Sequence, residues 1–75
     1  MPYDMLRRHL AQADQHIAAS SHLIARQEAL IAKLERNGHD ASAARHLLAL
    51  FQETLRQMQA HREMLLPLAL INQRP

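Results

Sequence analysis

The chain has 75 residues, which allows one small domain whose single core is marginal without a staple or a partner chain. It has no cysteine, which excludes disulfides and thiolate-ligated zinc or iron–sulfur sites, and its 48% hydrophobic but only 3% aromatic residues favour helix over strand. Nine basic and seven acidic residues give a net charge of +2, which is weak evidence for an anionic partner.

A first helix is predicted over residues 5–37, with Asp4 as a reasonable N-cap. A coiled-coil heptad supports it, because branched apolar residues recur every seven positions. These a positions are Leu10, Ile17, Ile24 and Ile31. The d positions between them include two polar residues, Ser20 and Gln27. The g positions, which widen the apolar face, are His9, His16, Leu23 and Leu30.

The predicted turn at residues 38–40 organises the chain. Gly38 is the only glycine, and it can take the left-handed conformation that closes a helix. Arg36 lies in the last turn of the first helix, where a positive charge suits the helix dipole. Asp40 offers a side-chain oxygen to cap the next helix. The sequence therefore predicts an antiparallel helical hairpin.

A second helix is predicted over residues 41–66, ending before Pro67, whose ring disfavours helical geometry in the preceding residue. Its a positions are Leu48, Leu55 and Arg62. Its d positions are Ala44, Phe51, Met58 and Leu65, and its g positions are Leu47, Thr54 and His61. The first helix would then overhang the second by about seven residues at its N-terminal end. The tail 67–75 begins with apolar residues and is expected to seek an apolar surface, such as that overhang.

Two helices cannot bury so wide an apolar stripe by themselves. Burying one leucine side chain is worth about 1.5–3 kcal/mol, so a partner surface is expected. A second copy would complete a dimeric four-helix bundle, and a different protein is the rival partner. The predicted dimer interface consists of Leu23, Leu30, Leu47, Leu50, Met5, Leu6, Leu10, Leu68, Leu70 and Ile71.

Six histidines invite a search for a metal site, but no two have the three- or four-residue spacing of ligands on one helix. His16 and His61 share one level of the hairpin and are the weak metal candidates; otherwise no metal or cofactor is expected. Arg62 at an a position should find an acceptor, either Asp14 or Glu63. If both histidines are partly buried near Arg62, their charged forms are disfavoured and the dimer should loosen in acid.

Phosphotransfer and nucleic-acid binding are the two alternatives to protein interaction. A phosphotransfer hairpin would use an exposed histidine such as His22, but Leu23 follows it where sensor kinases have an acidic residue. A nucleic-acid-binding hairpin would use its basic residues, but acidic residues are interspersed with them and stacking aromatics are scarce. Serine–histidine catalysis lacks a strand–turn–helix elbow, so the chain is not expected to be an enzyme. The basic residues in question are Arg7, Arg8, Arg26, Lys33, Arg36, Arg45 and Arg56.

A resemblance covers residues 16–66. The residues that carry it are His16-Ile17, Ala25-Arg26-Gln27, Ile31-Ala32-Lys33-Leu34-Glu35, Gly38-His39-Asp40, Leu47-Leu48, Phe51, Thr54 and His61-Arg62. With its Leu-Glu-x-x-Gly-His-Asp turn, the chain resembles an uncharacterised family of short bacterial stand-alone helical-hairpin proteins. The resemblance implies a hairpin and a bacterial cytoplasmic origin, and it carries over no active site.

Together these patterns predict an all-α hairpin that acts as a homodimeric protein–protein interaction or regulatory module. Nucleic-acid binding is the leading alternative, followed by phosphotransfer. A cytoplasmic location is expected because no charged segment with an apolar h-region opens the chain. No membrane partner is expected, because no apolar stretch approaches the length that spans a bilayer.

Overall fold

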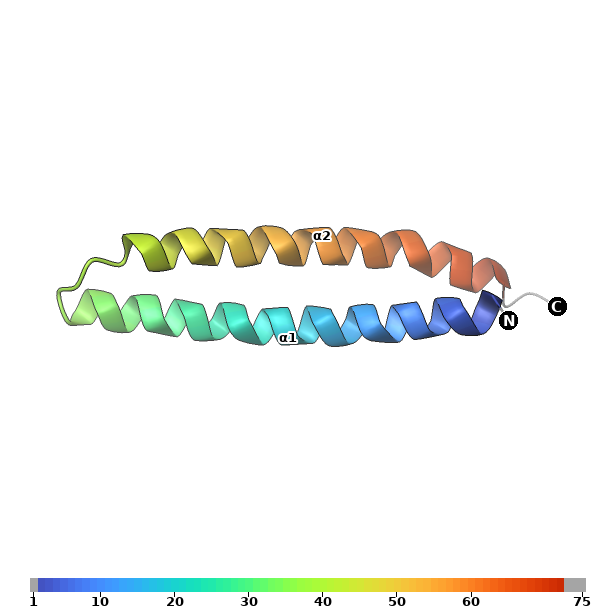
Figure 1. The fold of residues 1–75 in the computed structure, drawn as a ribbon, viewed down its shortest axis with the longest axis horizontal. Helices are drawn as coiled ribbons and strands as arrows, with labels where there is room; N and C mark the ends of the chain where they lie inside the picture. The colour runs from blue at the N-terminus through green and yellow to red at the C-terminus, as the bar shows by residue number, and fades with distance from the viewer. Residues whose placement is uncertain (1, 73–75) are drawn as a thin grey trace.

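The computed structural model describes residues 2–72, with the side chains of residues 4–68 and 70. It contains two antiparallel α-helices joined by a short turn, which confirms the predicted hairpin (Figure 1). The first helix, α1, spans Pro2–Arg36, and the second helix, α2, spans Ser42–Asn72. The two helices pack along their whole length, with both ends of the described chain at the same end of the hairpin.

The hairpin is a thin rod rather than a compact domain. Its dimensions are 61 × 14 × 13 Å, and its radius of gyration is 17.2 Å. A compact chain of this length has a radius of gyration of about 11 Å. With one layer of two helices, every residue lies close to solvent, so burial depends on contact between α1 and α2 alone.

The seam between the helices follows the predicted heptad. Among the described residues, Ile31 and Ala41 are the buried hydrophobic side chains, and Gln27 is the buried polar one. The remaining apolar a and d positions are half-buried: Leu6, Leu10, Ala13, Ile17, Ile24, Leu34, Ala44, Leu48, Phe51, Leu55, Met58 and Leu65. The three buried residues all lie in the half of the hairpin next to the turn.

The start of α1 differs from the prediction. The helix begins at Pro2, so Asp4 lies in its first turn and is not its N-cap. Proline suits the first position of a helix, because its missing N–H would have no intrahelical partner there. A carboxylate in the first turn also interacts favourably with the helix dipole, so Asp4 stabilises the same helix end from a different position.

The prediction that α2 ends before Pro67 is wrong, because the helix continues through this proline to Asn72. Proline biases the preceding residue away from helical geometry but does not forbid it. Strong helix formers follow Pro67, and helical continuation keeps the heptad against the first turns of α1, where Leu6 and Leu10 are half-buried. The predicted overhang of α1 is therefore absent, and residues 67–72 extend α2 rather than folding back as a tail.

Candidate functional site

The turn fixes how the two helices meet. Gly38 has a φ of 72°, in the left-handed region. The His39 N–H donates to the Leu34 carbonyl at 2.9 Å, and the Gly38 N–H donates to the Glu35 carbonyl at 3.1 Å. This pair of bonds is a Schellman motif, which satisfies the last carbonyls of α1. A Cβ at Gly38 would meet no atom within 4 Å, so glycine is required for its backbone conformation and not for space.

The start of α2 is capped from outside the helix. The Ala41 carbonyl accepts the first intrahelical bond, from the Arg45 N–H at 2.9 Å, so Ala41 occupies the N-cap position. Asp40, one residue earlier, accepts the Ser42 N–H at 2.9 Å and the Ser42 hydroxyl at 2.6 Å. The two bonds from Ser42, the hydroxyl bond first, hold the pKa of Asp40 below its usual value. Asp40 thus caps α2 through an Asx turn.

Two polar contacts near the turn join the helices. Gln27 lies at a d position, and its Nε2 donates to the Ala44 carbonyl at 3.0 Å. Arg45 of α2 bonds the carboxylate of Glu35 in α1 at 2.7 Å. The first contact explains why a buried polar side chain is tolerated in the seam, because its amide has a partner. Both contacts fix the register of α2 against α1.

One flank of the seam carries the ion pairs between the helices, and we call it the salt-bridge face: Asp14, Glu35, Arg45 and Arg62. Arg62 donates to Asp14, so the acceptor is the first of the two predicted candidates. Asp14, Glu35 and Arg45 occupy e positions, which lie on one side of the a and d seam. The charges of these four residues are therefore paired within the chain.

The other flank carries the leucines, and we call it the leucine face: Leu23, Leu30, Leu47 and Leu50. These side chains are 40–53% exposed, so the hairpin leaves them uncovered. Three of them occupy g positions, on the side of the seam opposite to the e positions. A hollow of about 250 Å³ on this flank is lined by Ser20, Leu23, Phe51 and Thr54. Phe51 and Thr54 are not among the predicted interface residues. Thr54 occupies a g position, and Phe51 occupies a d position beside the g positions.

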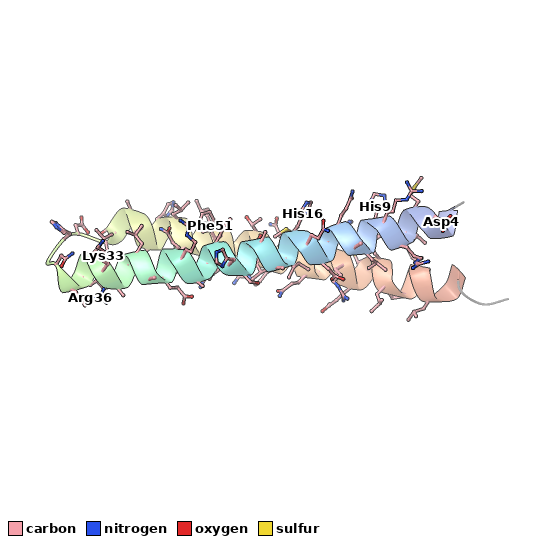
Figure 2. All side chains as sticks on the ribbon, turned by 90° about the horizontal axis from the view of Figure 1, so that it is seen from below. Asp4, His9, His16, Lys33, Arg36 and Phe51 are labelled. Carbon is pink, nitrogen blue, oxygen red and sulfur yellow. The ribbon has the colours of Figure 1, made fainter. Side chains whose placement is uncertain are left out.

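Histidines continue the same flank towards the open end of the hairpin. His16 from α1 and His61 from α2 line one hollow, together with Thr54, which also borders the hollow beside Leu23. Figure 2 shows His9 and His16 on one side of α1. Both His16 and His61 are exposed, and Arg62 pairs with Asp14 on the opposite face. The condition under which acid should loosen the dimer, burial of these histidines beside Arg62, is therefore not met.

The remaining predicted interface residues lie at the open end. Met5, Leu68 and Leu70 are exposed, at 51–60% of their surface. Leu6 and Leu10 are half-buried against α2, so part of their surface is already covered. The side chain of Ile71 lies outside the described part of the structure. The open end therefore adds scattered apolar surface to the leucine face.

The residues proposed for other functions are dispersed. His22 is exposed on the outer surface of α1. Of the basic residues, Arg45 pairs with Glu35 and Arg56 pairs with Glu53, which holds the pKa of Glu53 below its usual value. Within residues 2–72, no group of three His, Cys, Asp or Glu side chains is placed to hold a metal ion.

Comparison of the chain with protein-family models, with curated proteins and with solved structures finds no match. The resemblance to short bacterial hairpin proteins therefore stays a prediction. Neither helix, over its described residues, is apolar enough along its length to cross a membrane. The salt-bridge face and the leucine face are therefore the features from which a function can be inferred.

Proposed function

We propose that the chain is a non-enzymatic interaction module that works as a homodimer, in which the leucine faces of two hairpins pack into a four-helix bundle. The observation that carries this proposal is the exposed fraction of Leu23, Leu30, Leu47 and Leu50, which is 40–53% in the single hairpin. Large apolar side chains gathered on one flank are typical of a surface that another protein covers.

The elongated hairpin exposes more surface than a compact chain of the same mass. The hairpin exposes 5889 Å². A compact monomer of the same mass exposes about 4,700 Å², so the hairpin exposes roughly 1,200 Å² more. If two hairpins each covered that excess, the interface would bury about 2,400 Å² in total, which is the range of obligate homodimers.

A second copy suits the leucine face, because the g positions along that flank of the hairpin lack fixed charge. None of its g positions is Asp, Glu, Lys or Arg; they are His9, His16, Leu23, Leu30, Leu47, Thr54, His61 and Leu68. In a two-fold dimer the same patch is buried on both subunits, so a charged patch would oppose like charges. The ion pairs that join the two helices lie on the salt-bridge face, away from the proposed contact.

Oligomeric state tests the proposal directly. Light scattering on the purified chain should give about twice the mass of 8.6 kDa, and the melting temperature should rise with protein concentration. Leu30→Glu should abolish the dimer, because it buries an unpaired carboxylate in the interface. Ala29→Glu, an exposed f position on the outer surface of α1, is the matched control and should stay dimeric.

A chain that is monomeric at all concentrations, with a melting temperature independent of concentration, would overturn the homodimer. If Leu30→Glu and Ala29→Glu had equal effects on association, the interface would lie elsewhere on the hairpin. Recovery of a stoichiometric complex with a different protein from the native cell, without self-association, would assign the leucine face to that partner instead.

A further inference from the structure

The hollow between His16 and His61 brings together two imidazoles from different helices. The two residues are 45 positions apart in the sequence, yet both occupy g positions and the hairpin places them at one level. The hollow has a volume of about 230 Å³ and opens to solvent on the leucine-face flank. It can therefore admit a small hydrated ion without displacing the seam.

We propose that His16 and His61 form an interhelix chelate for a divalent transition-metal ion, with zinc as the reference ion. Neutral imidazole is a preferred ligand of zinc, copper and nickel, whereas magnesium and calcium require oxygen ligands. Two imidazoles on facing helices bind one ion only when the hairpin is folded, so the folded state gains the binding free energy.

The residues around the two histidines do not repel a cation. The other residues that line the hollow are Ala13, Thr54, Gln57 and Met58, and none of them carries a charge. The nearest cation in sequence, Arg62, pairs with Asp14, and these two residues line a different hollow. No fixed positive charge of the hollow itself therefore opposes the ion.

The bound ion would cross-link the two helices in the part of the hairpin where the fewest side chains are buried. His16 and His61 lie in the half of the molecule in which no described side chain is buried, far from the hydrogen bonds of the turn. Small domains commonly use a structural metal where the core is insufficient. Water can fill the remaining coordination positions, or the same two histidines of a second copy can fill them. Both ligands come from one chain, so the site does not depend on the proposed homodimer.

The test uses the full chain, stripped of metal with a chelator and then titrated with zinc sulfate at pH 7.5. Zinc at about ten times its dissociation constant should raise the melting temperature by roughly 5 °C or more. Competition with a chromophoric zinc indicator should give a stoichiometry of one ion per chain, or one per two chains if two copies share it. Calcium should leave the melting temperature unchanged.

Substitutions locate the site. His16→Gln and His61→Gln should each lose most of the zinc-dependent rise, because one imidazole alone binds zinc weakly. His22→Gln and His46→Gln are matched controls, since both histidines are exposed f-position residues on the outer surface, and they should keep the rise. All four changes are at exposed positions and leave the seam intact, so each variant should fold.

A second measurement does not rely on stability. With one equivalent of Cu²⁺, electron paramagnetic resonance should show coupling to at least two imidazole nitrogens, and His61→Gln should remove one of them. The inference is overturned if zinc leaves the melting temperature unchanged and the protein withdraws no zinc from the indicator. It is also overturned if the response survives in both His16→Gln and His61→Gln. Light scattering separates this result from the homodimer, because a monomer that keeps the zinc response would refute only the dimer.

Discussion

The two ends of the hairpin are built differently. At the turn end, Ile31, Ala41 and Gln27 are buried, and hydrogen bonds join both helix termini and both helices. At the open end, none of the described side chains is buried, and Arg62 pairs with Asp14 across the seam. The same heptad runs through both ends, but at the open end Arg62 replaces an apolar residue in the a line.

The difference between the two ends shows that the turn also strengthens the packing of the helices close to it. Near the turn, the two helices are held together by a short covalent link, so little additional entropy is lost when their side chains pack. Far from the turn, the contact between the helices is stabilised mainly by burial of apolar surface, and two helices alone bury little such surface. The open end is therefore the part of the hairpin that has most to gain from a second copy or a bound metal ion.

The largest expected effect comes from matched truncations at two a positions. Ile31→Ala should destabilise the fold by about 2–5 kcal/mol, because it empties a buried site. Ile17→Ala, at a half-buried site towards the open end, should cost clearly less. Chemical denaturation at fixed protein concentration measures both. Equal costs would mean that the open end is as well packed as the turn end in solution.

The next effect tests the turn itself. Gly38→Val should destabilise by more than about 1 kcal/mol, because a β-branched residue is strained at positive φ. Gly38→Asn is the matched control, since asparagine tolerates this conformation, and it should cost much less. Thermal melts of the two variants give the comparison. If Val and Asn are equally tolerated, the left-handed residue does not hold the turn.

A smaller effect of opposite sign is expected at the open end. Arg62→Leu gives up a partly exposed ion pair worth about 0–1 kcal/mol and completes the apolar a line beside Ile17. It should therefore stabilise the hairpin, by about 1 kcal/mol. Arg56→Leu, at an exposed position away from the seam, is the control and should be nearly neutral. A net loss of stability in Arg62→Leu would show that the ion pair with Asp14 holds the open end together.

The smallest effect concerns acid. The Ser42 bonds lower the pKa of Asp40 from its usual 3.8, so ionised Asp40 stabilises the folded state above that pH. This contribution is lost as the pH falls through the lowered pKa, because the unfolded chain binds the proton first. Melting temperatures measured from pH 5 to pH 2 should therefore fall, and Asp40→Asn should flatten part of the fall. An identical profile in Asp40→Asn would remove the Asx turn as its cause.

The sequence predicted the fold well because its signals are local. The heptad placed Ile31 and Leu48 in the seam, and the single glycine marked the left-handed turn residue at position 38. The acceptor for Arg62 was also narrowed to two residues, because an arginine at an a position needs a carboxylate within reach. The site was less predictable. His16 and His61 are exposed, and Arg62 turns to Asp14 on the other flank; a heptad assignment specifies neither outcome.

Pro67 shows why the helix end could not be predicted. Its effect on the preceding backbone is a local preference, which continued packing against Leu6 and Leu10 can override. Likewise, Asp4 has the side chain of an N-cap, but the helix begins at Pro2 because proline also suits a first helical position. In both cases two local preferences pointed to different helix ends, and the sequence alone did not show which preference is stronger.

By itself, then, the sequence determined the two helices, the position of the turn and the stripe of each helix that faces the other, because periodicity and backbone preference act over a few residues. Only the tertiary structure decided which flank of that stripe is closed by ion pairs and which stays open. The pairing of Asp14 with Arg62 and of Glu35 with Arg45 depends on the register between helices. That register is set by the turn bonds and by Gln27 reaching the Ala44 carbonyl, a contact across 17 residues that no local pattern encodes.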